Sequence, residues 1–304
     1  MVDTPVIDLH IDTIYALANR FSSGDLCSNT GHVDLQRMKT LQGMTSCFAL
    51  FVDGKETPER WNAVNELYRC FLKRMDENGE TITHVRTAEN PVGCHAILSI
   101  EEGGVLEGDL GRLEVLRSWG VRLMTIGWNW ENELGFPHNR KGGLKPFGHQ
   151  VVKRMEELKI LVDVSHLNDE GIDDITTVAR RPVVASHSNC RSVCDHSRNL
   201  SDELIAKIAE TGGVVGLTFC PPFVTRHSTH TSVEALVAHA RHLYKVGGSE
   251  VLALGTDYDG FTGTCEVRGY QDLHILHAAL GKAGFSSSLL EGFWYRNARR
   301  VLGA

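Results

Sequence analysis

The chain has 304 residues, with 31 Lys and Arg against 38 Asp and Glu, so its formal net charge is −7. This length fits two domains or one closed α/β barrel, and we expect a single domain over residues 1–304. Basic residues occur only as isolated pairs such as Arg180-Arg181, which argues against nucleic acid or an anionic membrane as a partner.

No apolar run approaches the roughly 20 residues that a membrane-spanning helix needs, and the N-terminus lacks a basic segment followed by an apolar one. We therefore expect no membrane partner and a mature protein that comprises the whole chain. The 8 cysteines include no C-x-x-C pair, and the spacing of Cys190 and Cys194 is not that of a zinc ribbon. Reduced thiols in the cytoplasm fit this pattern best.

Apolar runs of strand length alternate with amphipathic segments of helix length along the whole sequence, which predicts repeated βα units and a parallel sheet. The predicted helices include Pro58 to Asn78, Gln150 to Leu158, Asp202 to Glu210 and Ser232 to Val246. Ser201 is a plausible N-cap for the third of these, and Gly212-Gly213 a stop signal. The predicted strands are Val6 to His10, Met44 to Val52, Ala96 to Glu101, Arg122 to Trp128, Ile160 to His166, Val183 to His187, Val214 to Phe219 and Val251 to Asp257.

Eight parallel strands with intervening helices predict an α/β fold, a single (β/α)8 TIM barrel, whose active sites lie at the C-terminal ends of the strands. A doubly wound open sheet is the alternative, but the sequence lacks both G-x-G-x-x-G after the first strand and a P-loop motif. Three long connections should form the rim of the pocket: Glu131 to Phe147, Pro221 to Thr231 and Tyr258 to Tyr270.

Strand alternation assigns the side chains of the third predicted strand. Leu98 and Ile100 share one face, whereas Ile97, Ser99 and Glu101 share the other. Glu101 can therefore point into the mouth of the barrel, and Glu102 should point away from it.

Polar residues suited to metal binding close several of the predicted strands. His10 and Asp12 are two residues apart, so both side chains project from one face and can reach one ion. Glu101, His166, His187 and Asp257 end later strands. Imidazoles and carboxylates in this number could hold two divalent metals, with one carboxylate bridging them and a shared water activated for hydrolysis.

The sequence resembles the renal or membrane dipeptidase family of the amidohydrolase superfamily, as a bacterial-type member, nearly from end to end. The resemblance rests on VIDLHIDT (6 to 13), LSIEEGG (98 to 104), GVRLMTIGWN (120 to 129), GLKPFGHQVVKRM (143 to 155), LVDVSHL (161 to 167), VVASHSNCRSVCDHSRNL (183 to 200) and ALGTDYDG (253 to 260).

The resemblance implies an amidohydrolase-like barrel with two metal ions, Zn²⁺ in the first instance. One metal would be held by His10, Asp12 and Glu101, and the other by Glu101, His166 and His187, with Glu101 as the bridge. The spacing from Glu101 to Gly120-Val121-Arg122 also matches the family pattern without a gap, which favours Glu101 over Glu102.

Further roles follow from the same resemblance. Asp257 matches the family's acid/base residue, which takes a proton from the activated water and delivers it to the departing amine. Arg198 matches the arginine that binds a substrate carboxylate, a task to which a planar bidentate donor is suited. The alternative is that Arg198 forms a salt bridge at the surface. Asp8 and Asp163 lie next to ligands in sequence and are candidates for orienting an imidazole.

The chain departs from the renal-type pattern at the end of the fourth predicted strand. Where that pattern has a histidine that holds and polarises the substrate carbonyl, this chain has Trp128 followed by Asn129. An indole offers only one N–H and carries no titratable charge, so another group must serve the oxyanion. The candidates are Asn129 and His138, of which we favour His138.

These features predict a metal-dependent dipeptidase that hydrolyses small dipeptides, L,L and also L,D, through a water activated by two metals. One alternative is a barrel hydrolase acting on another amide, a lactam or a lactone, and the other is a catalytically silent barrel that binds a ligand. The resemblance further suggests a homodimer. The remaining histidines, including His239 on a predicted helix and His227 and His230 in a polar loop, are expected at the surface or its boundary.

Overall fold

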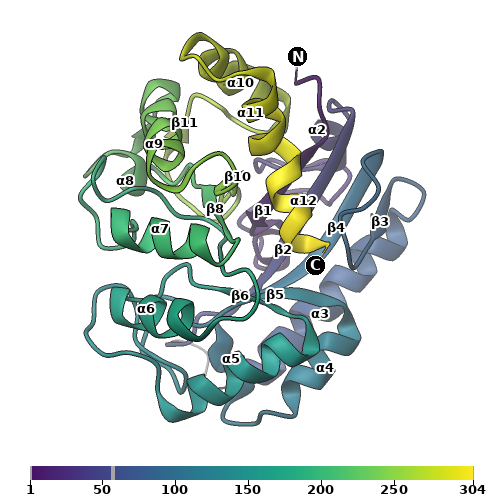
Figure 1. Ribbon diagram of the computed structural model, residues 1–304. Helices are drawn as coiled ribbons and strands as arrows, with labels where there is room; N and C mark the ends of the chain where they lie inside the picture. Colours follow the sequence, from purple (N-terminus) through teal and green to yellow (C-terminus); the bar gives the residue numbers. More distant parts are fainter. Residues whose placement is uncertain (1, 56–58, 304) are drawn as a thin grey trace.

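The computed structural model describes residues 2–55 and 59–303 and contains a closed parallel barrel (Figure 1). Its strands follow the order β2-β1-β10-β8-β7-β6-β5-β4-β3, and β2 also pairs with β4, which closes the ring and leaves β3 outside it. The predicted TIM barrel is thereby confirmed. The strands of this sheet are β1 (Val6–Ile11), β2 (Gly43–Phe51), β3 (Ile82–His84), β4 (Gly93–Glu101), β5 (Val121–Thr125), β6 (Leu161–Asp163), β7 (Val184–Ala185), β8 (Val214–Leu217) and β10 (Leu252–Leu254).

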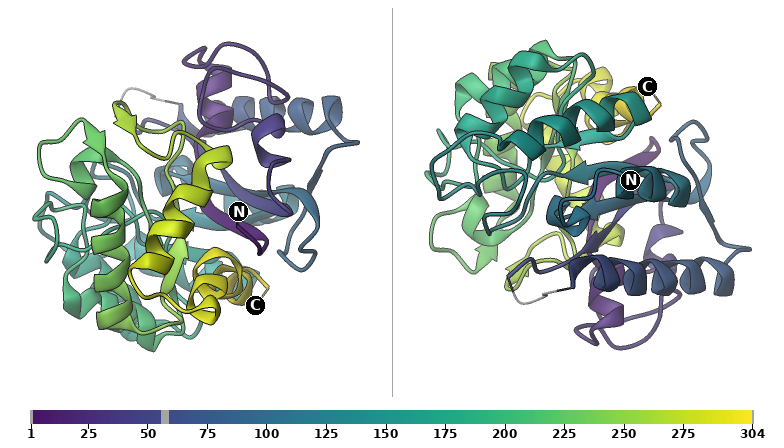
Figure 2. Two further views of the ribbon diagram at one scale, coloured as in Figure 1. Left: turned by 90° about the horizontal axis from the view of Figure 1, so that it is seen from above. Right: turned by 90° about the horizontal axis from the view of Figure 1, so that it is seen from below.

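Helices surround the barrel, as the views from above and below show (Figure 2). The α-helices are α1 (Thr13–Ala18), α2 (Leu35–Met38), α3 (Arg60–Glu77), α4 (Arg112–Trp119), α5 (Pro146–Leu158), α6 (Asp169–Val178), α7 (Asp202–Glu210), α8 (Pro221–Val224), α9 (Val233–Gly247), α10 (Leu273–Lys282), α11 (Ser287–Glu291) and α12 (Asn297–Leu302). Shorter helical turns are η1 (Gly103–Leu106), η2 (Tyr270–Asp272) and η3 (Gly292–Arg296), the last a π-helix.

The predicted helices agree with this assignment to within a few residues at the ends. Helix α7 has the predicted bounds, and the Ser201 side chain accepts a hydrogen bond from the Leu204 N–H at 3.3 Å. Helix α5 starts at Pro146, whose fixed φ suits the first helical turn, four residues before the predicted start. The predicted start of α3 at Pro58 lies outside the described residues.

The alternation predicted for β4 is also present. Ile97 packs inside the barrel with Ile7, Leu9 and Leu123, whereas Leu98 and Ile100 belong to the core between the strands and the surrounding helices. The C-terminal helix α12 closes the end of the barrel opposite the C-terminal strand ends, because its Ala298, Val301 and Leu302 join the interior cluster. The barrel is therefore a filled core that presents polar groups at one end.

Several strands end earlier than predicted. β6 ends at Asp163 and β10 at Leu254, three residues before His166 and Asp257. His166 and Asp257 have φ angles of 72° and 64°, in the left-handed region, where a strand cannot continue. Such conformations cost free energy in a non-glycine residue and persist only where the surroundings impose them, often at active sites.

Two of the three predicted rim segments are tied to each other. β9 (His230–Thr231) and β11 (Thr264–Cys265) form a small parallel sheet, so His230 lies in a strand, although it was expected in an irregular loop. The strand conformation of His230 comes from backbone pairing between two loops that are distant in sequence, so local sequence composition does not predict it.

His239 is fully buried, so its expected place at the surface is wrong. It shares the inner face of α9 with Leu236, Ala240 and Leu243. Its Nδ1 accepts from the Cys190 N–H at 3.2 Å and its Nε2 donates to the Val224 carbonyl at 2.9 Å, which is the pattern of a neutral imidazole. Burial accordingly lowers the pKa of His239 to about 4.

Within the described residues, no helix is long and apolar enough to cross a membrane. All 8 cysteines are free thiols.

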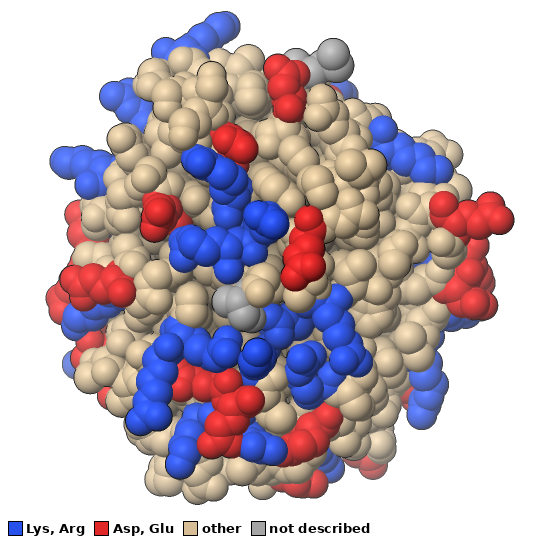
Figure 3. All heavy atoms as spheres, turned by 45° about the vertical axis from the view of Figure 1, so that its right-hand side comes forward, with Lys and Arg blue, Asp and Glu red and all other residues tan. Residues whose placement is uncertain are grey.

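Lys and Arg side chains gather on one face of the molecule (Figure 3). Burial lowers the pKa of Arg122, and the nearby charges of Arg117, Arg181 and Arg86 lower it further. The Arg122 guanidinium donates to the Leu302 carbonyl of α12 at 3.2 Å.

Candidate metal and active site

Six of the predicted site residues lie together at the C-terminal end of the barrel. His10 is the penultimate residue of β1 and Asp12 follows this strand, Glu101 ends β4, and His166, His187 and Asp257 follow β6, β7 and β10. Each is at most 8% exposed. Burial of this many ionisable groups in one place needs a specific electrostatic compensation.

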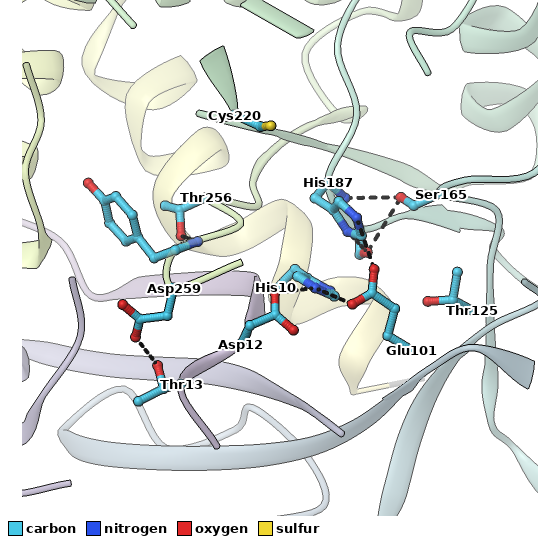
Figure 4. A network of polar contacts seen from close by, with 12 residues as sticks. His10, Asp12, Thr13, Glu101, Thr125, Ser165, His187, Cys220, Thr256 and Asp259 are labelled. Carbon is cyan, nitrogen blue, oxygen red and sulfur yellow. Dashed lines mark hydrogen bonds and ion pairs between the residues drawn. The ribbon is translucent and has the colours of Figure 1, made fainter. Parts of the chain in front are cut away.

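The Glu101 carboxylate faces both His10 and His187 (Figure 4). Its Oε2 is 3.4 Å from His10 Nε2, which is also 3.2 Å from Asp12 Oδ2. Its Oε1 is 3.1 Å from His166 Nε2 and 3.6 Å from His187 Nε2. The two oxygens of one carboxylate therefore face two separate sets of candidate ligands.

The distal ring nitrogens of two histidines are held by oxygen atoms. Ser186 Oγ donates to Asp163 Oδ2 at 2.5 Å, so it must accept from His187 Nδ1–H, which lies 2.8 Å away. Likewise, His166 Nδ1 donates to Asn129 Oδ1 at 2.8 Å. Both contacts leave the Nε2 lone pairs facing the cluster, and these two nitrogens are only 2.9 Å apart. This arrangement is the one in which histidines bind metal ions.

Asp8 makes different contacts from those expected of it. Its carboxylate accepts from Thr256 Oγ1 at 2.5 Å, from the Thr256 N–H at 2.9 Å, from Tyr270 Oη at 3.0 Å and from the His10 N–H at 3.2 Å. The expectation that Asp8 orients an imidazole is therefore wrong, because its partners hold the backbone beside His10 and Asp257. Asp163 reaches an imidazole only through Ser186, a residue of the Ala-Ser-His segment for which sequence analysis predicted no role.

The electrostatics of the cluster follow from its burial. Burial and the Arg198 charge lower the pKa of His166 to about 3, and burial and His10 hold the pKa of His187 well below its usual range. Burial raises the pKa of Glu101, but His10 and His166 outweigh it and hold this pKa below its ordinary value. Burial lowers the pKa of His10, but Glu101 and Asp12 outweigh it and raise this pKa well above its ordinary value. Neutral His166 and His187 beside an ionised Glu101 have the protonation states that a divalent cation requires, whereas a cation would have to displace the proton of His10.

Two carboxyl groups of the cluster have raised pKa values. Burial and the neighbouring Glu101 raise the pKa of Asp12 to about 6. Burial and the neighbouring Asp12 raise the pKa of Asp257 well above its ordinary value. A cation bound among these groups would relieve the repulsion between the carboxylates.

The donor set fits divalent metal ions. Nitrogen and oxygen atoms of His10, Glu101 and His187 form one group within 4.8 Å, and those of His10, Asp12 and Asp257 form another. Ligands bound tetrahedrally at about 2.0–2.1 Å from zinc are about 3.3 Å apart, close to the separations around Glu101. Asp12 Oδ1 is buried and has no hydrogen-bond partner among the described residues, which leaves it available to an ion. Gly260 is required beside this group, because a Cβ there would lie 2.2 Å from Asp12 Oδ2.

Arg198 is 3% exposed, which excludes the surface alternative for this residue. Its guanidinium donates to Ser188 Oγ at 3.2 Å and to the His187 carbonyl at 3.0 Å, and lies 5.2 Å from the centre of the Phe223 ring. Its Nε is buried without a partner among the described residues. A buried cation with unused donor capacity is suited to binding an anion.

Trp128 and Asn129 follow β5 and line a cavity of about 780 Å³ together with Asp12, Glu101 and Asp257. The backbone there is fixed by Glu102, which is fully buried and accepts from the Trp128 N–H at 2.8 Å and from Asn132 Nδ2 at 2.7 Å. Glu102 thus points away from the cluster around Glu101, as the alternation predicts, and anchors the loop that carries Trp128. The sequence did not indicate this second role.

His138 lines a separate cavity of about 370 Å³, with Arg140, Arg191 and Ser197 among its neighbours. Its ring accepts from or donates to Ser197 Oγ at 2.8 Å, and its backbone N–H donates to the His166 carbonyl at 2.7 Å. The contact with the backbone holds the left-handed turn at His166. This placement disfavours His138 as the oxyanion donor, because its side chain does not line the cavity that contains Glu101. Asn129, which does line that cavity, becomes the better candidate.

Comparison with known proteins agrees with this geometry. The model of the membrane dipeptidase family, peptidase family M19, matches residues 1–304. An uncharacterised protein in the pqqA 5′ region of Klebsiella pneumoniae is 32% identical over 68% of this chain and 80% of its own length. An uncharacterised dipeptidase of Schizosaccharomyces pombe is 31% identical over 68% of this chain and 52% of its own length.

Solved structures give the same assignment. A metallopeptidase of Rhodobacter sphaeroides, liganded with a phosphinate mimic of the dipeptide L-Ala-D-Ala, has a TM-score of 0.89 at 26% identity, over 99% of both chains. Dipeptidase AC, a metallopeptidase of family M19, has a TM-score of 0.89 at 27% identity, over 98% of both chains. The chain therefore belongs to the membrane dipeptidase family, peptidase family M19, a family of dipeptide-hydrolysing enzymes.

Proposed function

We propose that this enzyme hydrolyses small dipeptides, L,L and also L,D, with two divalent ions, most simply Zn²⁺. His10, Asp12 and Glu101 would hold one ion, and Glu101, His166 and His187 the other. The observation that carries this proposal is the division of the two Glu101 oxygens between His10 on one side and His166 and His187 on the other. When bound, the ions would polarise the scissile carbonyl and lower the pKa of a water molecule.

The protein's own groups supply substrate binding and proton transfer in this proposal. Arg198 would grip the substrate's terminal carboxylate, which its Nε supports, since this nitrogen is buried and has no hydrogen-bond partner among the described residues. Asp257 would take a proton during attack and give it to the departing amine, a task that its raised pKa favours. Asn129 would donate its amide N–H to the developing oxyanion while its Oδ1 holds His166.

The L,D capacity is proposed because the phosphinate in the Rhodobacter sphaeroides structure mimics L-Ala-D-Ala. A homodimer and a cytoplasmic location are also proposals, the latter supported by the free thiols. Oligomeric state can be measured by light scattering of the purified protein.

The function is tested by hydrolysis of L,L and L,D dipeptides together with elemental analysis of the same preparation. About two ions per chain and activity on free dipeptides are expected. Arg198→Lys should weaken hydrolysis of free dipeptides, since a point charge replaces a bidentate donor, and amidation of the substrate's C-terminus should erase most of the difference. An enzyme that prefers blocked amides, lactams or lactones would refute the dipeptidase assignment, and a metal-loaded protein without any activity would indicate a silent barrel.

A further inference from the structure

Aromatic side chains form a continuous wall along one half of the main cavity. We call Tyr15, Phe21, Phe51 and Trp128 the aromatic wall, since all four line this cavity. The ring centres of Tyr15 and Phe51 are 4.8 Å apart, those of Phe51 and Trp128 are 4.7 Å apart, and those of Tyr15 and Phe21 are 5.8 Å apart. The wall offers a large apolar surface next to Glu101, with which Phe51 is in register on the neighbouring strand.

The wall and Arg198 lie on opposite sides of the barrel mouth. The wall follows β1, β2 and β5, whereas Arg198 lies in the segment after β7 and stacks near Phe223 after β8. In the closed ring, β2 and β7 are four strands apart, so their ends face each other across the metal cluster. The first and later parts of the barrel likewise occupy opposite sides in the view from above (Figure 2).

This arrangement orients a dipeptide. With its terminal carboxylate at Arg198 and its peptide bond at the metal cluster, the N-terminal residue must extend toward the half that carries the wall. Asp12 and Asp53 line the same half, so the substrate's ammonium group would meet negative charge there. The side chain of the N-terminal residue then lies beside the aromatic rings.

We propose that the aromatic wall is the binding site for a large apolar side chain on the N-terminal residue of the dipeptide, so the enzyme prefers substrates such as Phe-Ala over Ala-Ala. This inference rests on the proposed function. Tyr15 and Phe51 meet edge to face, as do Phe51 and Trp128, so these rings form one contiguous surface made mainly of carbon atoms.

The exposure of Phe21 supports the same conclusion independently. Its side chain is 74% exposed at the rim of the cavity, the largest exposure among the large hydrophobic residues described. A substrate side chain that covered Phe21 would remove this apolar surface from water. The cavity of about 780 Å³ also has room for a residue much larger than alanine.

The test uses the metal-loaded enzyme and three free dipeptides: Phe-Ala, Ala-Phe and Ala-Ala. The parent enzyme should show a kcat/KM for Phe-Ala at least roughly tenfold above that for Ala-Ala. Phe21→Ala should remove much of that preference, because it deletes the exposed ring that a large side chain would cover. Phe51→Leu should lower the preference further, since it removes the central ring of the wall.

Tyr244→Ala is the matched control, because Tyr244 is an aromatic residue that is 46% exposed on α9, away from this cavity. It should keep the parent's preference. Equal rates on Phe-Ala and Ala-Ala, or a preference for Ala-Phe that Phe21→Ala abolishes, would overturn the inference while leaving the dipeptidase assignment intact. Failure to cleave any of the three with both metals bound would instead count against the proposed function.

Discussion

Removal of the Ser186 hydroxyl should weaken metal binding without touching any proposed ligand. Ser186 Oγ joins Asp163 Oδ2, at 2.5 Å, to His187 Nδ1, at 2.8 Å, in a fully buried site. In Ser186→Ala, the Nδ1–H loses its acceptor, and the ring is no longer fixed in the tautomer that directs Nε2 at Glu101. Loss of such a contact behind a ligand typically lowers metal affinity about 10- to 100-fold.

That change corresponds to about 1.4 to 2.7 kcal/mol of binding free energy. The metal-free protein should also lose stability, because a buried donor left without a partner costs about 1–3 kcal/mol. Competition against a chelator of known affinity measures the first quantity, and denaturant unfolding of the metal-free protein measures the second.

Thr125→Val provides the control. Thr125 Oγ1 donates to the same Asp163 Oδ2 at 2.9 Å but does not contact His187. This variant should lose stability while its metal affinity stays within a few-fold of the parent. If Ser186→Ala binds metal as tightly as Thr125→Val does, the contact with the imidazole does not orient the ligand and the reasoning fails.

Three further predictions concern proton transfer, the oxyanion and acid stability. Asp257→Asn should retain both metals and lose roughly two to four orders of magnitude in kcat, because an amide cannot accept the proton; loss of metal in elemental analysis would make Asp257 a ligand. Asn129→Ala should lower kcat by about two to three orders of magnitude if Asn129 is the oxyanion donor, and His138→Ala should change it only a few-fold; the reverse result would restore His138 to that role. For His239, the folded-state pKa of about 4 lies below the ordinary 6.5, so the unfolded state takes up the proton first and stability falls as the pH decreases from 6.5 to 4. Between pH 7 and pH 5 this titration should lower the free energy of unfolding of the metal-free parent by about 2 kcal/mol. In urea titrations over the same pH range, the unfolding free energy of His239→Gln should therefore fall by about 2 kcal/mol less than that of the parent; equal losses in both proteins would rule out His239 as the source.

The sequence by itself determined the barrel and the residue types of the candidate metal site. The alternation of apolar runs with amphipathic segments predicts parallel strands. The two-residue periodicity of a strand assigns Glu101 and Ile97 to the inward face and Leu98 to the outward face. Such signals are local, because they depend on residues two to four positions apart.

Only the tertiary structure decided which polar groups support the candidate ligands. Ser186 acts through Asp163, Glu102 anchors the turn at Trp128, and His138 lines a cavity other than the one expected. It also decided the burial of His239, whose partners Cys190 and Val224 come from other elements. These contacts join segments far apart in the chain, and whether a polar side chain is buried or solvated depends on what packs over it, a quantity that no local pattern contains.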